Sequence, residues 1–203
     1  MKIGILGSGD VAKSLAKGFK KHGNEVKLGT RDVSKVTEFP AGSFADVAAF
    51  GEIIVLATHG VATVELVRSI GTQPFSGKIV MDVTNPLEFV DGAPRLSVGF
   101  DDSLGEQIQR EIPGAYVVKV FNTVGHQHMI DPQLPGGPPD MFIAGNNDAA
   151  KERVAGYVED FGWNCTDLGD MTNARLLEPM CMVWVNYGRA TGQWDHAFKL
   201  IRK

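Results

Sequence analysis

The sequence is poor in cysteine, in positive charge and in long apolar runs, and each scarcity argues against a class of protein. Cysteine occurs only at positions 165 and 181, without the spacing of a C-x-x-C pair. This argues against a disulfide framework or a thiolate zinc site. Two such residues are typical of small core side chains in a reduced cytosolic protein.

The charge balance argues against nucleic acid as the main partner. The 20 Lys and Arg residues stand against 24 Asp and Glu residues, which gives a formal net charge of −4. A phosphate backbone requires a basic surface instead. Four lysines between residues 13 and 21 are interpreted as the solvated face of a helix.

Long apolar runs and the residue patterns of several enzyme classes are also missing. Runs such as residues 53–57 are far too short to cross a bilayer, and the short apolar start, interrupted by Asp10, does not resemble a signal peptide. No Ser/His/Asp order, zinc spacing or acid pair points to nucleophilic or metal-dependent catalysis. We therefore expect a cytoplasmic protein without a membrane partner and without a metal.

What the sequence does contain is enough apolar material for a sizeable core. Apolar residues make up 43% of the 203 residues and charged residues 22%, which is typical of a folded chain rather than a disordered one. The length corresponds to one large domain or to a domain with a small appendage. No internal repeat, linker or low-complexity tract interrupts it.

Strand-like apolar runs alternate with segments of helical periodicity. This predicts an α/β fold of the Rossmann type, a doubly wound, mostly parallel sheet with a small C-terminal helical extension. Strands are predicted at residues 2–6, 25–28, 52–57, 78–82, 115–120, 141–144 and 163–166. Helices are predicted after the first glycine turn, over 43–50, from 58–60 onward, over 103–111 and from Asn147 or Asp148.

Two segments without a clear period are predicted to be loops. They are residues 87–100 and residues 131–140, the second with four prolines and two glycines. We divide the chain into a dinucleotide-binding Rossmann domain, residues 1–170, and a helical extension, residues 171–203, that covers the active site. Pro179 can kink the helix of this extension.

The glycine-rich turn after the first strand carries the nucleotide hypothesis. Gly7-Ser8-Gly9-Asp10-Val11-Ala12 matches the pattern G-x-G-x-x-G/A between a strand and a helix. Gly7 permits the turn, and Gly9 lets backbone N–H groups approach a pyrophosphate at the helix N-terminus. Ala12 is small enough for the helix to pack on the sheet. In this strand–helix–strand setting the motif predicts dinucleotide binding.

The second strand lacks the acid that an NAD site requires at its end. About twenty residues after the glycines, where Asp or Glu binds the ribose 2′-hydroxyl, the chain has Gly29-Thr30-Arg31. Arg31 can hold a 2′-phosphate with two charge-assisted hydrogen bonds, Thr30 can donate another, and Lys35 adds a positive charge. The alternative is a surface arginine paired with Asp32. We predict NADP (NADPH) as the cofactor.

Several motifs together resemble one known family over nearly the whole chain. They are the Gly7-Ser8-Gly9 turn, Thr30-Arg31 with Lys35, the runs 82–87 and 117–123, Ala144-Gly145-Asn146 and Leu177-Glu178-Pro179-Met180. The sequence resembles the NADP-dependent oxidoreductases related to coenzyme F-420-dependent NADP reductase. The fold of that family also forms the cytosolic domain of membrane ferric reductases.

The resemblance implies hydride transfer between NADPH and a flat acceptor, such as a deazaflavin or flavin, stacked on the nicotinamide. Such a transfer needs no nucleophile and no metal, because the protein positions two rings and excludes water. The 2′-phosphate would lie against Thr30, Arg31 and Lys35, and the pyrophosphate against Gly7, Ser8, Gly9, Asp10 and Val11. The nicotinamide end is expected at the carboxyl ends of later strands, at Thr58, His59, Asn85, Pro86, Asn122 and Thr123.

Two residues are candidates for a catalytic acid, and two more lie close by in sequence. His59 opens a helix, and Lys119 ends a strand and can act on a carbonyl substrate. The alternative for Lys119 is a structural or solvated lysine. His126 and His128 either contact the acceptor or are loop histidines without chemistry.

Three functions therefore remain open. The first is a reductase of a deazaflavin or flavin, the second is an NADP-linked dehydrogenase of a small carbonyl or imine compound, and the third is a non-enzymatic NADPH-binding redox sensor. The 131–140 loop and the helix with Trp184 and Tyr187 are candidates for the part that selects the acceptor. We also expect a homodimer, because a single small domain leaves the acceptor site open.

Overall fold

The strand–helix–strand unit predicted at the N-terminus is present in the computed structural model, which describes residues 1–202. Strand β1 (Lys2–Leu6) leads into helix α1 (Asp10–Lys21), and β2 (Glu25–Gly29) lies parallel to β1. Leu15 and Phe19 of α1 are completely buried against the sheet. The apolar spacing seen in the sequence thus buries one face of the helix, as predicted.

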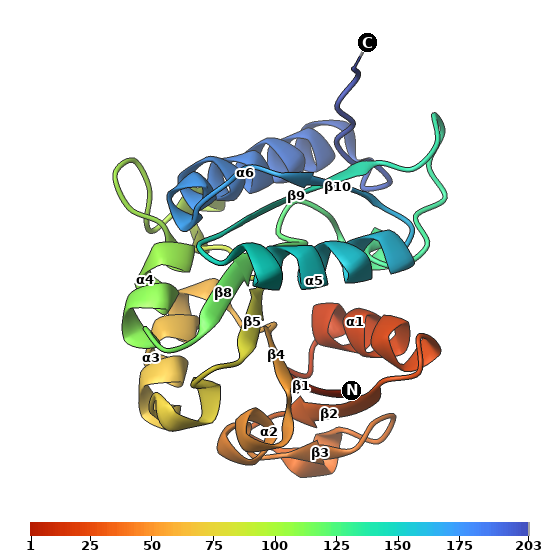
Figure 1. Ribbon diagram of the computed structural model, residues 1–203. Helices are drawn as coiled ribbons and strands as arrows, with labels where there is room; N and C mark the ends of the chain where they lie inside the picture. Colours follow the sequence, from red (N-terminus) through yellow and green to blue (C-terminus); the bar gives the residue numbers. More distant parts are fainter. Residues whose placement is uncertain (203) are drawn as a thin grey trace.

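The remaining elements complete one large sheet and its helical layers (Figure 1). They are η1 (Val33–Lys35), β3 (Ala41–Gly42), α2 (Phe44–Phe50), β4 (Ile53–Leu56), α3 (Gly60–Ile70), η2 (Gln73–Phe75), β5 (Ile79–Asp82), β6 (Leu87–Val90), β7 (Ala93–Leu96), α4 (Leu104–Glu111), β8 (Tyr116–Lys119), η3 (His126–His128), β9 (Asp140–Gly145), α5 (Asp148–Asp160), β10 (Asn164–Asp167), η4 (Met171–Asn173) and α6 (Ala174–Thr191).

The sheet has eight strands in the order β10-β9-β8-β5-β4-β1-β2-β3. All neighbours in this sheet run parallel except β8 and β9, which are antiparallel. Helices α1 and α5 cover one face, and α2, α3 and α4 cover the other. A doubly wound, mostly parallel Rossmann-type sheet is therefore confirmed.

One prediction was wrong in part. Residues 87–100 are not all loop, because β6 and β7 form an antiparallel two-stranded hairpin there. Its turn is Asp91-Gly92, and both residues have positive φ, 51° and 76°, as a tight two-residue hairpin turn requires. Pro94 within β7 weakens the strand pattern in the sequence. The two-residue strand β3 was also not predicted.

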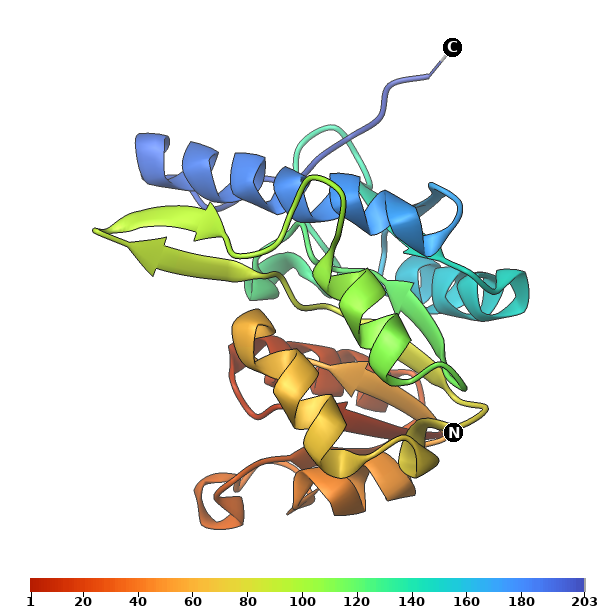
Figure 2. The same cartoon turned by 90° about the vertical axis from the view of Figure 1, so that its left-hand side faces the viewer.

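The C-terminal region packs over the hairpin and the end of the sheet. Helix α6 contacts β7 and β9, and Figure 2 shows it lying across the top of the molecule above the hairpin. The predicted helical extension, 171–203, is helical only as far as Thr191 in the part of it that the structure describes. After Gly192, with φ of 71°, a tail without helix or strand runs on to residue 202.

An aromatic cluster joins this tail to α6. The ring of His196 stacks on Trp184 with centroids 4.7 Å apart, and Tyr187 meets the same imidazole edge-on at 4.6 Å. Trp184 Nε1 donates to the His196 carbonyl oxygen at 2.9 Å, and Trp194 packs 5.3 Å from Trp184. The tail is therefore a fixed part of the fold around α6.

Candidate functional site

The turn between β1 and α1 can be made only with glycine at its first position. Gly7 has φ of 145°, and a Cβ atom there would lie 2.2 Å from the carbonyl oxygen of Ala57. Its N–H donates to the carbonyl oxygen of Gly29 at 3.0 Å. Gly7 thus brings the ends of β1, β2 and β4 close together.

The second glycine of the turn leaves a free space at the start of α1. Gly9 is the N-cap of α1 and no side chain caps the helix, so the first backbone N–H groups, including those of Asp10 and Val11, have no intrahelical partner. A Cβ atom at Gly9 would meet nothing within 4 Å. An uncapped, open helix N-terminus is the kind of place where a phosphate binds.

The end of β2 presents a free guanidinium beside this turn. Ser8 Oγ donates to Thr30 Oγ1 at 3.3 Å, which joins the glycine turn to the β2 end. Arg31 is exposed and makes no ion pair with any of residues 1–202. Asp32 pairs instead with Lys35 at 3.3 Å, and hydrogen bonds from Ser34 and Lys35 lower the pKa of the Asp32 carboxyl. The alternative pairing of Arg31 with Asp32 is not present.

The loops that follow β4 and β5 touch each other. Thr58 Oγ1 and Thr63 Oγ1 lie 3.0 Å apart, and exposed His59 is the N-cap of α3 without a side-chain hydrogen bond. A Cβ atom at Gly60 would lie 1.7 Å from the carbonyl oxygen of Asn85. This close approach fixes the start of α3 against Asn85. The next residue, Pro86, is buried.

The loops after β5 and β8 are joined by a pair of asparagines. Asn122 Nδ2 donates to Asn85 Oδ1 at 3.0 Å, and Asn85 Nδ2 donates to the carbonyl oxygen of Asn122 at 2.8 Å. Asn122 and Thr123 are each only 3% exposed. Asn122 Oδ1 is buried without a hydrogen-bond partner in residues 1–202, an unusual state for a buried acceptor.

Strained backbone lies directly before this pair. Phe121 is completely buried and has φ of 54°, a left-handed conformation that a bulky side chain rarely adopts. Such strain tends to persist at functional sites, where the surrounding structure holds it. No residue pattern around Phe121 signals this conformation.

Lys119 is a buried structural lysine rather than an exposed acid. Its side chain is 0% exposed, and its Nζ lies 2.7 Å from Asp82 Oδ2, 2.8 Å from Glu178 Oε1 and 2.9 Å from the carbonyl oxygen of Thr84. Burial alone would lower the pKa of the Lys119 ammonium, but the two carboxylates outweigh burial and raise it. The ammonium is thus enclosed by three oxygens and has no exposed surface at which a carbonyl substrate could meet it.

Comparisons with known proteins show the family of the chain. The profile of the family described as NADP oxidoreductase, coenzyme F420-dependent, matches residues 2–86. A solved structure from Arthrobacter sp. FB24, provisionally named an F420-dependent NADP-reductase, is 38% identical over the whole of both chains and superposes with a TM-score of 0.94. The chain belongs to this family of NADP oxidoreductases. It is an oxidoreductase whose cofactor is NADP.

Other proteins that the chain resembles differ in length and in name. The F420-dependent NADP reductase of Methanothermobacter marburgensis is 26% identical over 92% of each chain. The metalloreductase STEAP3 of Rattus norvegicus is 31% identical over 87% of this chain but only 36% of its own length. The chain thus spans about a third of the metalloreductases that it matches. A Streptomyces aurantiacus imine reductase, 13% identical with a TM-score of 0.69 over 94% of this chain and 64% of its own, shares the fold.

The residues present fit the NADP of this family. The open cradle at Gly9, the unpaired guanidinium of Arg31 and the unpartnered oxygen of Asn122 lie on the turn after β1 and the loops after β2 and β8. The backbone N–H groups at Gly9 are complementary to the pyrophosphate, and the positive charge of Arg31 is complementary to the 2′-phosphate. The free acceptor oxygen of Asn122 is complementary to the N–H groups of the nicotinamide carboxamide. Within residues 1–202 no group of three His, Cys, Asp or Glu side chains could hold a metal ion.

The two histidines after Asn122 lie in η3 and are only partly exposed. His128 Nε2 lies 2.8 Å from Asp195 Oδ1 of the tail. Gly125, just before η3, packs against the Trp184 ring. His128 therefore helps to hold the tail, and its predicted alternative role toward an acceptor stays a prediction, as does that of His126.

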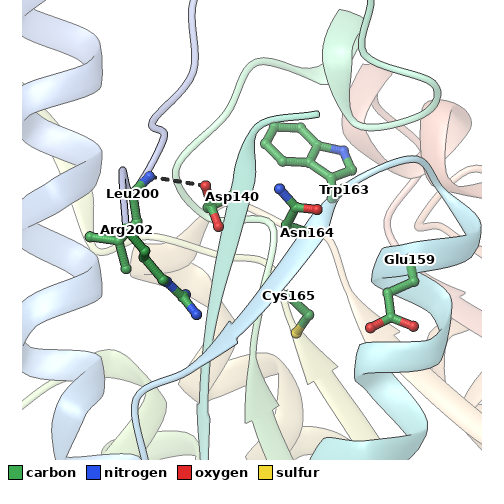
Figure 3. Close-up of a pocket in the computed structure, with 7 residues that line it drawn as sticks. All are labelled: Asp140, Glu159, Trp163, Asn164, Cys165, Leu200 and Arg202. Atoms are coloured by element: carbon green, nitrogen blue, oxygen red, sulfur yellow. Dashed lines mark hydrogen bonds between the residues drawn. The ribbon is translucent and has the colours of Figure 1, made fainter. Parts of the chain in front are cut away.

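Two surface cavities lie away from these loops. One, of about 580 Å³, is lined by residues of α5, β9, β10 and the tail (Figure 3), among them Glu159, Cys165 and Arg202. The other, of about 560 Å³, is lined by residues 131–135, Gly137, Pro138 and Gly162. Burial raises the pKa of the Cys165 thiol to about 12, so the thiol stays protonated and unreactive at neutral pH. Neither cavity contains a predicted nucleotide-binding residue.

Sequence reasoning missed the two partners of Lys119. Asp82 and Lys119 are the last residues of neighbouring strands and stand opposite each other in the sheet register, so a charged residue at both predicted strand ends was the available signal. Glu178 comes from α6, 59 residues after Lys119 in the sequence. No local pattern links positions so far apart.

Proposed function

We propose that the protein transfers a hydride between NADP(H) and a flat acceptor stacked on the nicotinamide, such as deazaflavin coenzyme F-420 or a flavin. The observation that carries the proposal is a row of close approaches at the carboxyl edge of the sheet, where Gly7 meets Ala57, Gly60 meets Asn85 and Asn85 bonds to Asn122. In open α/β sheets, ligands bind at this edge.

Each part of this edge has a distinct task in the proposal. Thr30, Arg31 and Lys35 bind the 2′-phosphate, and the backbone of residues 7–11 binds the pyrophosphate. The nicotinamide end is lined by Thr58, His59, Asn85, Pro86, Asn122 and Thr123. When bound, NADPH supplies the hydride itself, so the protein has to orient the ring and exclude water.

The chemistry of the side chains favours a stacked acceptor over a carbonyl or imine. Reduction of a carbonyl needs a proton donor, and the Lys119 ammonium is completely buried against Asp82, Glu178 and the Thr84 carbonyl oxygen. Exposed His59 is the remaining candidate donor of the two. Hydride transfer to a stacked deazaflavin or flavin needs neither Lys119 nor His59 as a proton donor.

The acceptor is tested by following NADPH oxidation with F-420, free flavins, ferric chelates and simple carbonyls in parallel. We expect turnover with F-420 or a flavin, and a His59→Ala variant that retains most of it. Turnover confined to carbonyls or imines, with loss of about 10²-fold in His59→Ala, would establish the dehydrogenase instead. Tight NADPH binding without turnover for any acceptor would establish a redox sensor.

We also propose a homodimer built on the outer face of α6. Leu176, Val183 and Tyr187 are 58%, 60% and 47% exposed, and with Met180 they follow the 4-3-4 spacing of a helix–helix seam. The opposite face of α6 is already buried through Leu177 and other residues. A helix that is apolar on both sides is normally covered on both sides.

We propose the cytoplasm as the location. Both cysteines are free thiols, as expected in a reducing compartment. None of the helices in residues 1–202 has the length and apolar character needed to cross a bilayer.

A further inference from the structure

The buried cluster of Asp82, Lys119 and Glu178 has no task in the proposed hydride transfer. It nevertheless joins four parts of the chain, β5, β8, α4 and α6. Two carboxylates and one ammonium are completely or almost completely buried there. Burying three charges is costly unless each one is paired and hydrogen-bonded.

Every oxygen of the two carboxylates faces a donor. Asp82 Oδ1 accepts from the Thr84 N–H at 2.9 Å and from the Thr84 hydroxyl at 2.6 Å, and Oδ2 faces Lys119. Glu178 Oε1 and Oε2 accept from the N–H groups of Gly105 and Leu104, both at 3.0 Å. Asp82 Oδ2 makes no hydrogen bond with residues 1–202 and is held only by its ion pair with Lys119, so the ammonium is the central contact of the cluster.

The cluster and the asparagine pair are linked through adjacent residues of the chain, once at Thr84 and Asn85 and once at Leu177 and Glu178. Thr84 donates two hydrogen bonds to Asp82 Oδ1 and accepts one from Lys119, and it is followed directly by Asn85. In α6, Glu178 belongs to the cluster, and the preceding Leu177 accepts from Asn122 Nδ2 at 2.8 Å. Two consecutive residues of α6 thus hold the cluster and the asparagine pair together.

The strained residue lies between the same two anchors. Phe121, with φ of 54°, stands between Lys119, fixed by the cluster, and Asn122, fixed by Asn85 and Leu177. A buried aromatic residue stays in this conformation only when its surroundings impose it. The cluster and the asparagine pair provide those constraints.

We propose that Asp82, Lys119 and Glu178 are positioning residues that hold the asparagine pair, and through it the nicotinamide end of the cofactor, in place for hydride transfer. The proposal rests on the proposed function, which locates the nicotinamide at Asn85 and Asn122. Without the ammonium, two buried carboxylates are left facing each other, so they separate and the loops after β5 and β8 shift. A misplacement of about 1 Å costs about 10²-fold in rate.

The test uses two ligands and two variants of the whole protein. Adenosine 2′,5′-bisphosphate carries the 2′-phosphate half of the cofactor without a nicotinamide, and NADPH carries both halves. For Lys119→Met and Glu178→Gln we expect bisphosphate affinity within about twofold of wild type and NADPH affinity lower by about tenfold. The single-turnover hydride-transfer rate should fall about 10²-fold. Calorimetric titration and stopped-flow absorbance give these values.

Lys151 provides a matched control. Its side chain is also mostly buried, and its ammonium bridges two exposed aspartates, Asp167 at 2.8 Å and Asp148 at 3.2 Å, but it lies on α5. Lys151→Met should lower the thermal midpoint while leaving the ratio of the two affinities and the hydride-transfer rate unchanged. A merely structural role of Lys119 predicts the same behaviour for both lysine variants.

The outcomes separate this proposal from the proposed function. Equal loss of affinity for both ligands, or an unchanged hydride-transfer rate in a folded Lys119→Met or Glu178→Gln protein, overturns the positioning role. If Lys119→Met does not fold, the milder Glu178→Gln variant decides in the same way. If the wild-type protein fails to oxidise NADPH with every acceptor tested, the proposed function is overturned. The difference between the two ligand affinities can still be measured in that case.

Discussion

At the scale of single residues, the two glycines of the first turn have different tasks, although the sequence motif treats them alike. Gly7→Ala would place a Cβ atom 2.2 Å from the Ala57 carbonyl oxygen at φ of 145°, so we expect a loss of stability of several kcal/mol. Gly9→Ala meets no atom within 4 Å, so the fold should persist within about 1 kcal/mol while NADPH affinity falls. Thermal melting and NADPH titration of both variants test this.

The two variants test different parts of the turn, Gly9→Ala through NADPH binding and Gly7→Ala through thermal stability. A Gly9→Ala protein that binds NADPH like wild type would show that the open space at the start of α1 is not where the pyrophosphate lies. A Gly7→Ala protein with an unchanged melting temperature would contradict the close approach of β1 to β4.

Arg31 decides the choice of cofactor at the same scale. Arg31→Ala should weaken NADPH binding by roughly 1.5–3 kcal/mol, a factor of about 10 to 100, and leave NADH binding unchanged. Lys35→Ala should cost less, because the Lys35 side chain is 82% exposed and shares its charge with Asp32. Titration of the three proteins with both cofactors checks the order, and an equal NADPH loss in both variants would contradict it.

These residues also mark the limits of prediction from sequence. The unpaired state of Arg31 and the space at Gly9 follow from local motifs, because spacing along one strand and one turn sets them. The partners of Lys119 do not, because Glu178 reaches it only after the whole sheet has formed. The conformation of Phe121 was equally out of reach, since no residue type announces a strained φ.

At the scale of elements, an acid-sensitive ion pair joins Asp102, just before the N-cap Ser103 of helix α4, to Arg110 in its last turn. Two hydrogen bonds from Arg110 and a smaller contribution from Gln107 lower the pKa of Asp102 to about 2 from 3.8. A carboxyl whose pKa is lower in the folded state stabilises above its unfolded pKa, and this is lost as the pH falls toward the folded value. We therefore expect Asp102 to contribute stability above about pH 4 and none below about pH 2.

Urea unfolding of wild type and Asp102→Asn between pH 5 and pH 2 tests this. The stability difference should be largest at pH 5 and vanish near pH 2. Comparison of the two proteins is needed because Glu106, whose pKa is lowered chiefly by Arg175, adds a loss in the same direction to both. A difference that does not change with pH would contradict the role of Asp102.

The elements were predicted well where one period dominates. Strands β1, β4 and β5 are short apolar runs, and α2, α4 and α5 begin at Ser43, Ser103 and Asn147, whose side chains accept from the first turn. The β6–β7 hairpin was missed because its strands are half exposed and include Pro94. Its Asp91-Gly92 turn was the signal that could have revealed it.

At the scale of the whole molecule, the outer face of α6 makes a prediction about assembly. Val183→Glu places a charge in the centre of the exposed apolar stripe, so we expect the dimer to dissociate at micromolar concentration. Val61→Glu is the matched control, because Val61 is 54% exposed on α3, away from the stripe. Light scattering after size exclusion gives the mass of each protein. A monomeric wild type, or a dimeric Val183→Glu, would contradict the proposal.

The aromatic cluster between α6 and the tail gives the molecule an optical reporter. The protein has three tryptophans, and the rings of two of them, Trp184 and Trp194, have centroids 5.3 Å apart in that cluster. Trp163 is buried elsewhere, and its Nε1 donates to the Met129 carbonyl oxygen. Changes in tryptophan emission therefore report chiefly on α6 and the tail. Tail docking and subunit dissociation should both be visible in this emission without any added dye.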